Sequence, residues 1–144
     1  MAKHVLTWAL GLLLFGASAA WAEDIVVVVN NQASVSSLTE QDIKDIYLGE
    51  VTYWGDTRIT AVGYQDGTAI QGSFLDKVMK TSENVYKTYW IKRIFREGGV
   101  PPSKAGSPDE ALRTVGSNAG GITYAPASAV AGASGVKEVF RIAN

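Results

Sequence analysis

The sequence predicts a single α/β domain with helices on both faces of a largely parallel sheet. Three observations support this class. The length of 144 residues suits about one domain, and the unbroken apolar run at 25–29 is typical of a strand buried on both faces. Segments with helical periodicity then separate the other strand-like segments. We find no internal repeat and no interdomain linker.

The first 22 residues have the pattern of a cleaved export signal. Lys3 and His4 precede an apolar run at 5–16, and the segment ends in Ala20-Trp21-Ala22, a small-x-small pattern that signal peptidase accepts. The run is shorter than the roughly 20 residues that span a bilayer. We therefore predict cleavage after Ala22, a domain at 23–144, a periplasmic location and no membrane span after processing.

The first half of this domain predicts two strand–helix units. After the strand at 25–29 and a polar loop at 30–37, Thr39 to Asp42 resembles a capping box that opens a helix ending at Gly49. A second strand is predicted at 58–62 and a second helix at 69–80. Three apolar residues of that helix fall one turn apart and are expected to face the core. They are Ile70, Phe74 and Val78.

The second half predicts two helices and two strands. The third helix covers 83–96, with Tyr86, Trp90 and Ile94 on one stripe. Ser107-Pro108-Asp109-Glu110 then opens a fourth helix, with serine at the N-cap and proline in the first turn, and this helix ends near Gly116. Short strands are predicted at 122–124 and 136–142. The aromatic residues Tyr47, Tyr53 and Trp54, around the end of the first helix, are expected to pack in the core.

Composition excludes several functional classes. The chain has no cysteine, and its one histidine is His4, within the predicted signal. The mature domain therefore lacks Ser-His-Asp and Cys-His catalytic systems and His or Cys zinc sites. A formal net charge of −1 also argues against a nucleic-acid partner, which requires a basic face. We predict a protein that is not an enzyme and needs no metal or cofactor.

The segment Gln65-Asp66-Gly67-Thr68 is the main candidate binding site. It joins a predicted strand to a helix, and the free N–H groups and dipole of a helix N-terminus attract anions. Gly67 would let a ligand approach closely. The alternative is an ordinary helix cap formed by Asp66 or Thr68, without a ligand. Weaker candidates on the polar loop at 30–37 are Ser34, Ser36 and Ser37.

Several segments together resemble the periplasmic phosphate-binding proteins of ABC transporters. The resemblance rests on the order and spacing of short motifs and covers about residues 25–142. That family has two lobes that close over phosphate, whereas this chain resembles one lobe. The motifs are Val28-Val29-Asn30, Ser37-Leu38-Thr39, Ile46-Tyr47-Leu48-Gly49, Trp54-Gly55-Asp56, Gln65-Asp66-Gly67-Thr68, Phe74-Leu75, Trp90 and Ala119-Gly120-Gly121-Ile122-Thr123-Tyr124-Ala125.

The resemblance implies a single lobe of a periplasmic-binding-protein-like fold that binds phosphate or another small anion and cooperates with an ABC permease. This chain departs from the family in three places. Gln65 stands where the family has arginine, Gly67 alone replaces a Ser-Gly pair, and Thr123 replaces a glycine. A neutral glutamine cannot form the bidentate, charge-assisted fork of arginine, so we expect weak phosphate binding. The alternative function is a lobe reused as a protein-interaction module in the cell envelope, without small-molecule transport.

Overall fold

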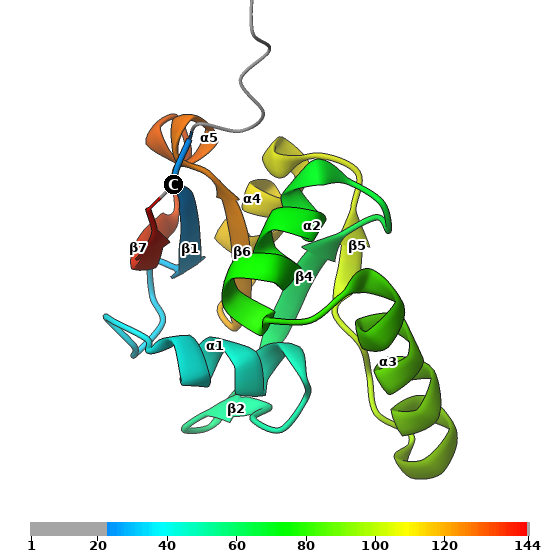
Figure 1. Cartoon of the computed structure of the whole chain (residues 1–144). Coiled ribbons are helices and arrows are strands. Elements are labelled where there is room, and N and C mark those ends of the chain that lie inside the picture. The colour runs from blue at the N-terminus through cyan, green and yellow to red at the C-terminus, as the bar shows by residue number, and fades with distance from the viewer. Residues whose placement is uncertain (1–22, 144) are drawn as a thin grey trace, which may run out of the picture.

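Five strands form one central sheet in the order β5-β4-β6-β1-β7 (Figure 1). The structure is a computed structural model that describes residues 23–143. Strand β4 pairs in parallel with β5 and β6, whereas β1 pairs antiparallel with β6 and β7. Four strands therefore point one way and only β1 opposes them, which confirms a largely parallel sheet. The strands are β1 (Ile25–Asn30), β4 (Thr60–Tyr64), β5 (Ser103–Ala105), β6 (Gly121–Pro126) and β7 (Val136–Ile142).

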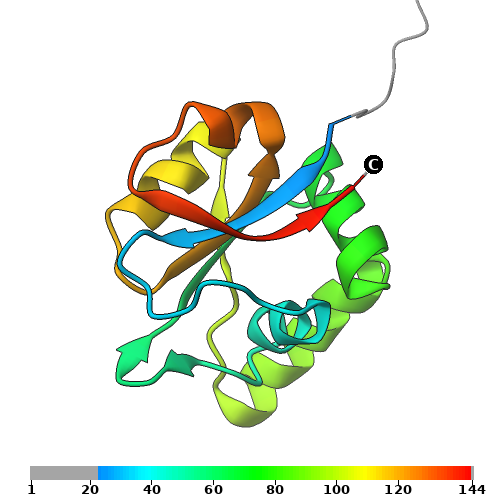
Figure 2. The same ribbon diagram turned by 90° about the vertical axis from the view of Figure 1, so that its left-hand side faces the viewer.

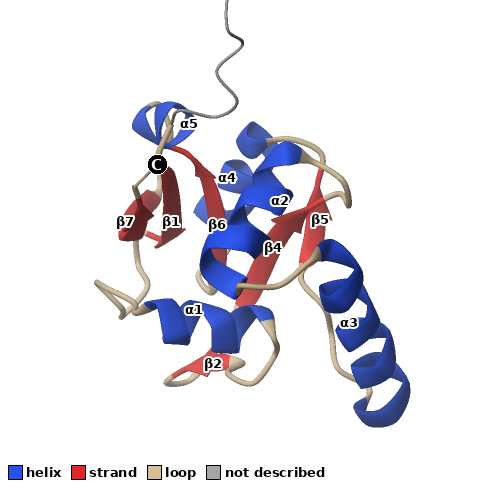
Figure 3. Cartoon of the chain, in the orientation of Figure 1, coloured by secondary structure: helices blue, strands red, loops and turns tan. Residues whose placement is uncertain are grey.

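Helices cover both faces of this sheet, as the sequence predicts. Helices α1 and α2 lie on one face, and α4 and α5 lie on the other (Figure 2). Helix α2 continues directly into a π-helical turn, η1. Helix α3 extends away from the sheet beyond β5, and a small hairpin of β2 and β3 follows α1 (Figure 3). These elements are α1 (Glu40–Tyr47), β2 (Tyr53–Trp54), β3 (Thr57–Arg58), α2 (Ala69–Phe74), η1 (Leu75–Met79), α3 (Glu83–Glu97), α4 (Pro108–Gly116) and α5 (Ala127–Ala131).

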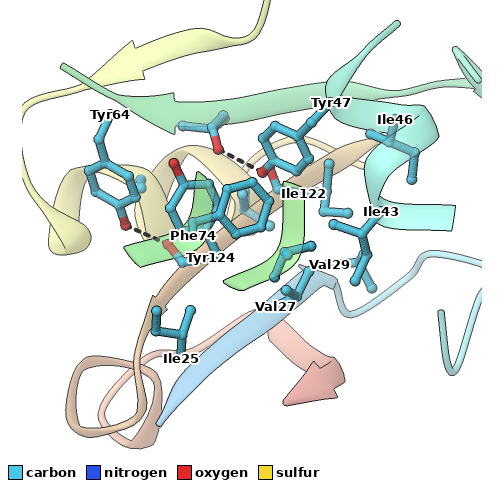
Figure 4. Close-up of a cluster of buried hydrophobic side chains, with 14 of the residues drawn as sticks. Ile25, Val27, Val29, Ile43, Ile46, Tyr47, Tyr64, Phe74, Ile122 and Tyr124 are labelled. Atoms are coloured by element: carbon cyan, nitrogen blue, oxygen red, sulfur yellow. Dashed lines mark hydrogen bonds between the residues drawn. The ribbon is translucent and has the colours of Figure 1, made fainter. Parts of the chain in front are cut away.

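Strand β1 is buried on both faces because successive side chains of a strand point to opposite sides. Val27 and Val29 face the larger core cluster, together with Phe74 and other residues from α1 and α2 (Figure 4). Val26 and Val28 face a smaller cluster beneath α4 and α5. All four valines are 0% exposed. The apolar run is continuous because helices cover both faces of this strand.

The predicted helix starts are confirmed. The Thr39 hydroxyl accepts a hydrogen bond from the Asp42 N–H at 3.1 Å, and the Asp42 carboxylate accepts one from the Thr39 N–H at 2.8 Å, which completes a capping box. The Ser107 hydroxyl accepts from the Glu110 N–H at 3.2 Å. The predicted core residues of the second helix, Ile70, Phe74 and Val78, are also buried.

Helix α3 differs from its predicted stripe. Of the three residues, only Trp90 is buried, where its indole N–H donates to the Tyr47 carbonyl at 3.2 Å. Tyr86 is half-buried, and Ile94 is 45% exposed. The helix contacts the end of α1 and the residues after it through its middle, where Tyr86 and Tyr89 donate to main-chain carbonyls and Arg93 Nη1 donates to Glu50 Oε1 at 2.8 Å. Tyr53 likewise differs from the expected core packing, since it is 50% exposed on β2, whereas Tyr47 and Trp54 are buried.

Two consecutive glycines, Gly120 and Gly121, allow neighbouring backbone to pack closely against the start of β6. A side chain at Gly120 would collide with the Arg58 carbonyl, and one at Gly121 would lie 2.8 Å from the Val115 Cα. The Thr60 N–H donates to the Gly120 carbonyl at 2.8 Å. The glycine pair therefore serves chain packing.

No helix within residues 23–143 is long and apolar enough to cross a membrane.

Candidate functional site

The loop at 65–68 connects the carboxyl end of β4 to the first turn of α2, as the sequence predicts. Gly67 has a φ of +82°, a left-handed conformation that favours glycine. Thr68 is the N-cap residue of α2, but its hydroxyl donates to the Gln65 carbonyl at 2.9 Å and does not cap the helix. Gln65, Asp66 and Gly67 are exposed, so the loop is open to a ligand.

The side chain of Gln71 holds this loop from below. Gln71 is 6% exposed, and its Nε2 donates to Asp66 Oδ1 at 3.2 Å. Its Oε1 accepts from the Gly67 N–H, also at 3.2 Å. Gln71 thus fixes the Asp66 carboxylate and occupies one of the loop amides that the sequence analysis assigned to a ligand.

A cation that the sequence analysis missed completes the site. Lys104 Nζ lies 3.1 Å from Asp66 Oδ2. Strand β5 brings it there, because its parallel pairing with β4 places Lys104 opposite Gly63. Hydrogen bonds from Lys104 and Gln71 lower the pKa of Asp66 below its ordinary value of 3.8, so the carboxylate is charged at neutral pH. No short-range pattern connects two residues 38 positions apart.

The structure does not bring the candidate serines into this site. Ser34, Ser36 and Ser37 are exposed and follow the carboxyl end of β1, which is antiparallel to β6. Val29 and Ala61 both align with Ile122, so the serine loop lies at the start of β4. The loop at 65–68 lies at the other end, roughly 13 Å away at about 3.3 Å per residue. A single small anion cannot contact both loops.

The site offers neutral donors and one cation for an anion. Donors include the amides of the loop and of the first turn of α2, and Lys104 supplies the positive charge. The Gly67 amide, the Thr68 hydroxyl and the Lys104 ammonium all have partners within the domain, so an anion must exchange these contacts. Residues 23–143 contain no group of His, Cys, Asp and Glu suited to hold a metal ion.

The fold is similar to that of substrate-binding receptors of ABC transporters. An ABC-type phosphate transport receptor from Vibrio cholerae matches with a TM-score of 0.63 at 19% identity. A protein described as a phosphate ABC transporter substrate-binding protein with bound phosphate, from Clostridium perfringens, gives 0.63 at 23%. PstS from Borrelia burgdorferi gives 0.61 at 16%. Each match covers 81% of this chain.

These likenesses establish the fold. The chain spans less than half of the three structures, covering 45%, 44% and 46% of them. The chain thus has the fold of part of such a receptor, which confirms the resemblance found in the sequence. No protein-family model matches the chain, and no curated protein matches its sequence significantly.

Proposed function

We propose that this chain is an exported binding lobe for a small anion, with phosphate as the ligand, and that it serves as a substrate-binding component beside an ABC permease. It is a binding protein, not an enzyme. The observation that carries the proposal is the Asp66-Gly67-Thr68 loop at the start of α2, with Lys104 beside it. Its occurrence in a fold shared with phosphate receptors, one of which is described with bound phosphate, supports this ligand.

Binding should be weak, because Gln65 lacks the charge of an arginine. We expect a dissociation constant between roughly micromolar and millimolar. Isothermal titration of the purified protein with phosphate measures it directly. Gln65→Arg should tighten binding by adding a charge-assisted donor beside the loop. The matched control is Gln32→Arg, which adds the same charge at the opposite end of the sheet and should change nothing.

Two results would contradict the phosphate assignment. One is absence of binding at millimolar phosphate in the wild type without rescue by Gln65→Arg. The other is equal tightening by Gln65→Arg and Gln32→Arg, which would indicate nonspecific attraction.

Export to the periplasm is part of this proposal. The predicted signal at 1–22 lies outside the described residues. The mature domain at 23–144 would be the part that cooperates with the permease. The intact mass of the exported protein should show Glu23 as its first residue. A mature form that retains the apolar run at 5–16 would contradict export by cleavage.

The exposed apolar side chains of α3 favour a second candidate, a protein-interaction module in the cell envelope. Val85, Ile91 and Phe95 are 62%, 59% and 92% exposed on this helix. Exposed apolar side chains grouped on one element are typical of protein contacts. If titration detects no phosphate binding and Gln65→Arg does not restore it, this function is favoured over transport.

A further inference from the structure

An aromatic cavity of about 210 Å³ lies between α3, the α2–η1 helix and the sheet edge formed by β4 and β5. It adjoins the loop at 65–68 but extends away from it, under α3. Small-molecule sites are typically concave and apolar, with a few polar groups that fix orientation. Its principal wall residues are Tyr64, Phe74, Tyr86, Trp90, Pro102 and Tyr124.

The hydroxyl of Tyr124 is the unusual polar group in this cavity. Tyr124 is 2% exposed, and its ring stacks on Phe74 with centroids 3.8 Å apart (Figure 4). The neighbouring buried tyrosines donate to main-chain carbonyls: Tyr47 to Val62 at 2.8 Å and Tyr64 to Tyr124 at 2.6 Å. Among residues 23–143 the Tyr124 hydroxyl has no hydrogen-bond partner.

This hydroxyl is available to a ligand. Every fully buried side-chain nitrogen or oxygen in the described part of the chain has a hydrogen-bond partner. The unpaired Tyr124 hydroxyl is therefore not fully buried, and it is accessible from the cavity that Tyr124 lines. Burial raises the pKa of Tyr124 well above its ordinary value of 10.0, so the group keeps its proton at neutral pH and can donate it. Buried polar groups normally have partners, and a ligand oxygen would supply one here.

The mouth of the cavity carries net positive charge. Asp66, Lys87 and Lys104 all line it. Asp66 pairs with Lys104 at 3.1 Å, and the charge of Lys87 further lowers the pKa of Asp66. One carboxylate against two ammonium groups leaves a single positive charge, which favours an anionic end on the ligand.

The volume limits the ligand to one ring. A cavity of roughly 150 Å³ lined by apolar side chains binds benzene, so about 210 Å³ suits one ring with small substituents. Aromatic walls favour a flat ring that stacks against them or meets their edges. We infer that this cavity binds a monocyclic hydroxylated aromatic acid, with its hydroxyl oxygen at Tyr124 and its carboxylate at Lys87.

Titration calorimetry with 4-hydroxybenzoate and benzoate tests this inference. The hydroxylated acid should bind the purified protein roughly three- to tenfold more tightly than benzoate, the effect of one additional hydrogen bond. Tyr124→Phe should remove this difference while leaving benzoate binding unchanged. Its matched control is Tyr53→Phe, since Tyr53 is half exposed on β2 and is not part of the cavity wall.

Two further variants test the size and charge of the site. Lys87→Gln should weaken both acids equally and leave phenol binding unchanged. Gly63→Ala adds a methyl group 3.7 Å from the Tyr124 hydroxyl, an ordinary contact that narrows the cavity without a clash. It should weaken both acids and serves as the test if Tyr124→Phe fails to fold.

Three results would overturn the inference: no binding of either acid at millimolar concentration, an unchanged preference for 4-hydroxybenzoate in Tyr124→Phe, or equal loss in Tyr53→Phe. Phosphate titration of the same samples separates this inference from the proposed function. A protein that binds phosphate but neither aromatic acid overturns only the aromatic site.

Discussion

Asp66 links the binding loop to the rest of the domain. Its carboxylate accepts hydrogen bonds from Gln71 on α2 and Lys104 on β5, so two separate elements hold one exposed loop residue. These contacts orient the loop but also occupy groups that an anion would need. A bound anion must therefore compete with Asp66 for Lys104, which is a further reason to expect weak affinity.

The pKa of Asp66 can be tested directly. Carboxyl NMR titration should give a value below 3.8, because Lys104 and Gln71 stabilise the charged form. The unfolded chain then takes up the proton first, so this group stabilises the fold above about pH 4 and loses its effect as the pH falls through the folded pKa. Lys104→Gln should raise the pKa toward 3.8, and Lys87→Gln should raise it less. An unchanged pKa in Lys104→Gln would contradict the contact.

At the scale of elements, the α2–η1 helix combines regular and irregular parts. Six α-helical residues lead into five π-helical residues, and Lys80 ends the helix at a φ of 55°, unusual for a residue other than glycine. Apolar residues of both parts, including Phe74 and Val78, are buried. Core packing therefore maintains the irregular second half.

Gly72 in this helix is a site for stabilisation. It lies in α2, and an added Cβ would meet nothing within 4 Å. Gly72→Ala should raise the free energy of unfolding by about 0.5 to 1 kcal/mol, since glycine loses more backbone entropy on folding. Gly98→Ala is the matched contrast: its Cβ also meets nothing, but its φ is +66°. It should lower stability by about 1 kcal/mol. Urea unfolding measures both, and equal effects would contradict the assigned backbone conformations.

At the scale of the whole molecule, β1 joins the two helical layers. It lies between β6 and β7, and its alternating valines supply both core clusters. Helix α3, by contrast, carries exposed apolar side chains, so substitutions of these residues should weaken partner binding more than they destabilise the fold.

Val27→Asp tests this central role. Val27 is 0% exposed and lies opposite Tyr124 and Phe140 in the sheet. An unpaired carboxylate there should lower the free energy of unfolding by about 3 to 5 kcal/mol, enough to unfold a marginal domain. Val100→Asp makes the same change at a residue that is 72% exposed and should cost less than about 0.5 kcal/mol. Thermal melts followed by circular dichroism should separate the two variants, and similar melts would contradict the burial of β1.

The elements that were predicted correctly from the sequence are those with a distinctive local pattern of residues. The valine run of β1, the capping box at Thr39, the N-cap at Ser107 and the apolar spacing of Ile70 and Phe74 all depend on neighbouring residues, and all are confirmed. Strand β5 and helix α5 were missed because three and five residues are too few to show a period. The predicted strand at 58–62 is likewise divided between β3 and β4, since the hairpin ends at Arg58.

The α/β class, the two-sided burial of β1 and the position of the Gln65–Thr68 loop at a strand–helix junction all follow from local sequence patterns. Which residues meet at that loop depends on the tertiary structure. Parallel pairing of β4 with β5 brings Lys104 to Asp66, and the reversed direction of β1 carries Ser34, Ser36 and Ser37 to the opposite end of the sheet. The tertiary structure also determines that the Tyr124 hydroxyl opens into a cavity. Local patterns reflect contacts within a few residues, whereas strand order and direction result from packing the whole chain into one core.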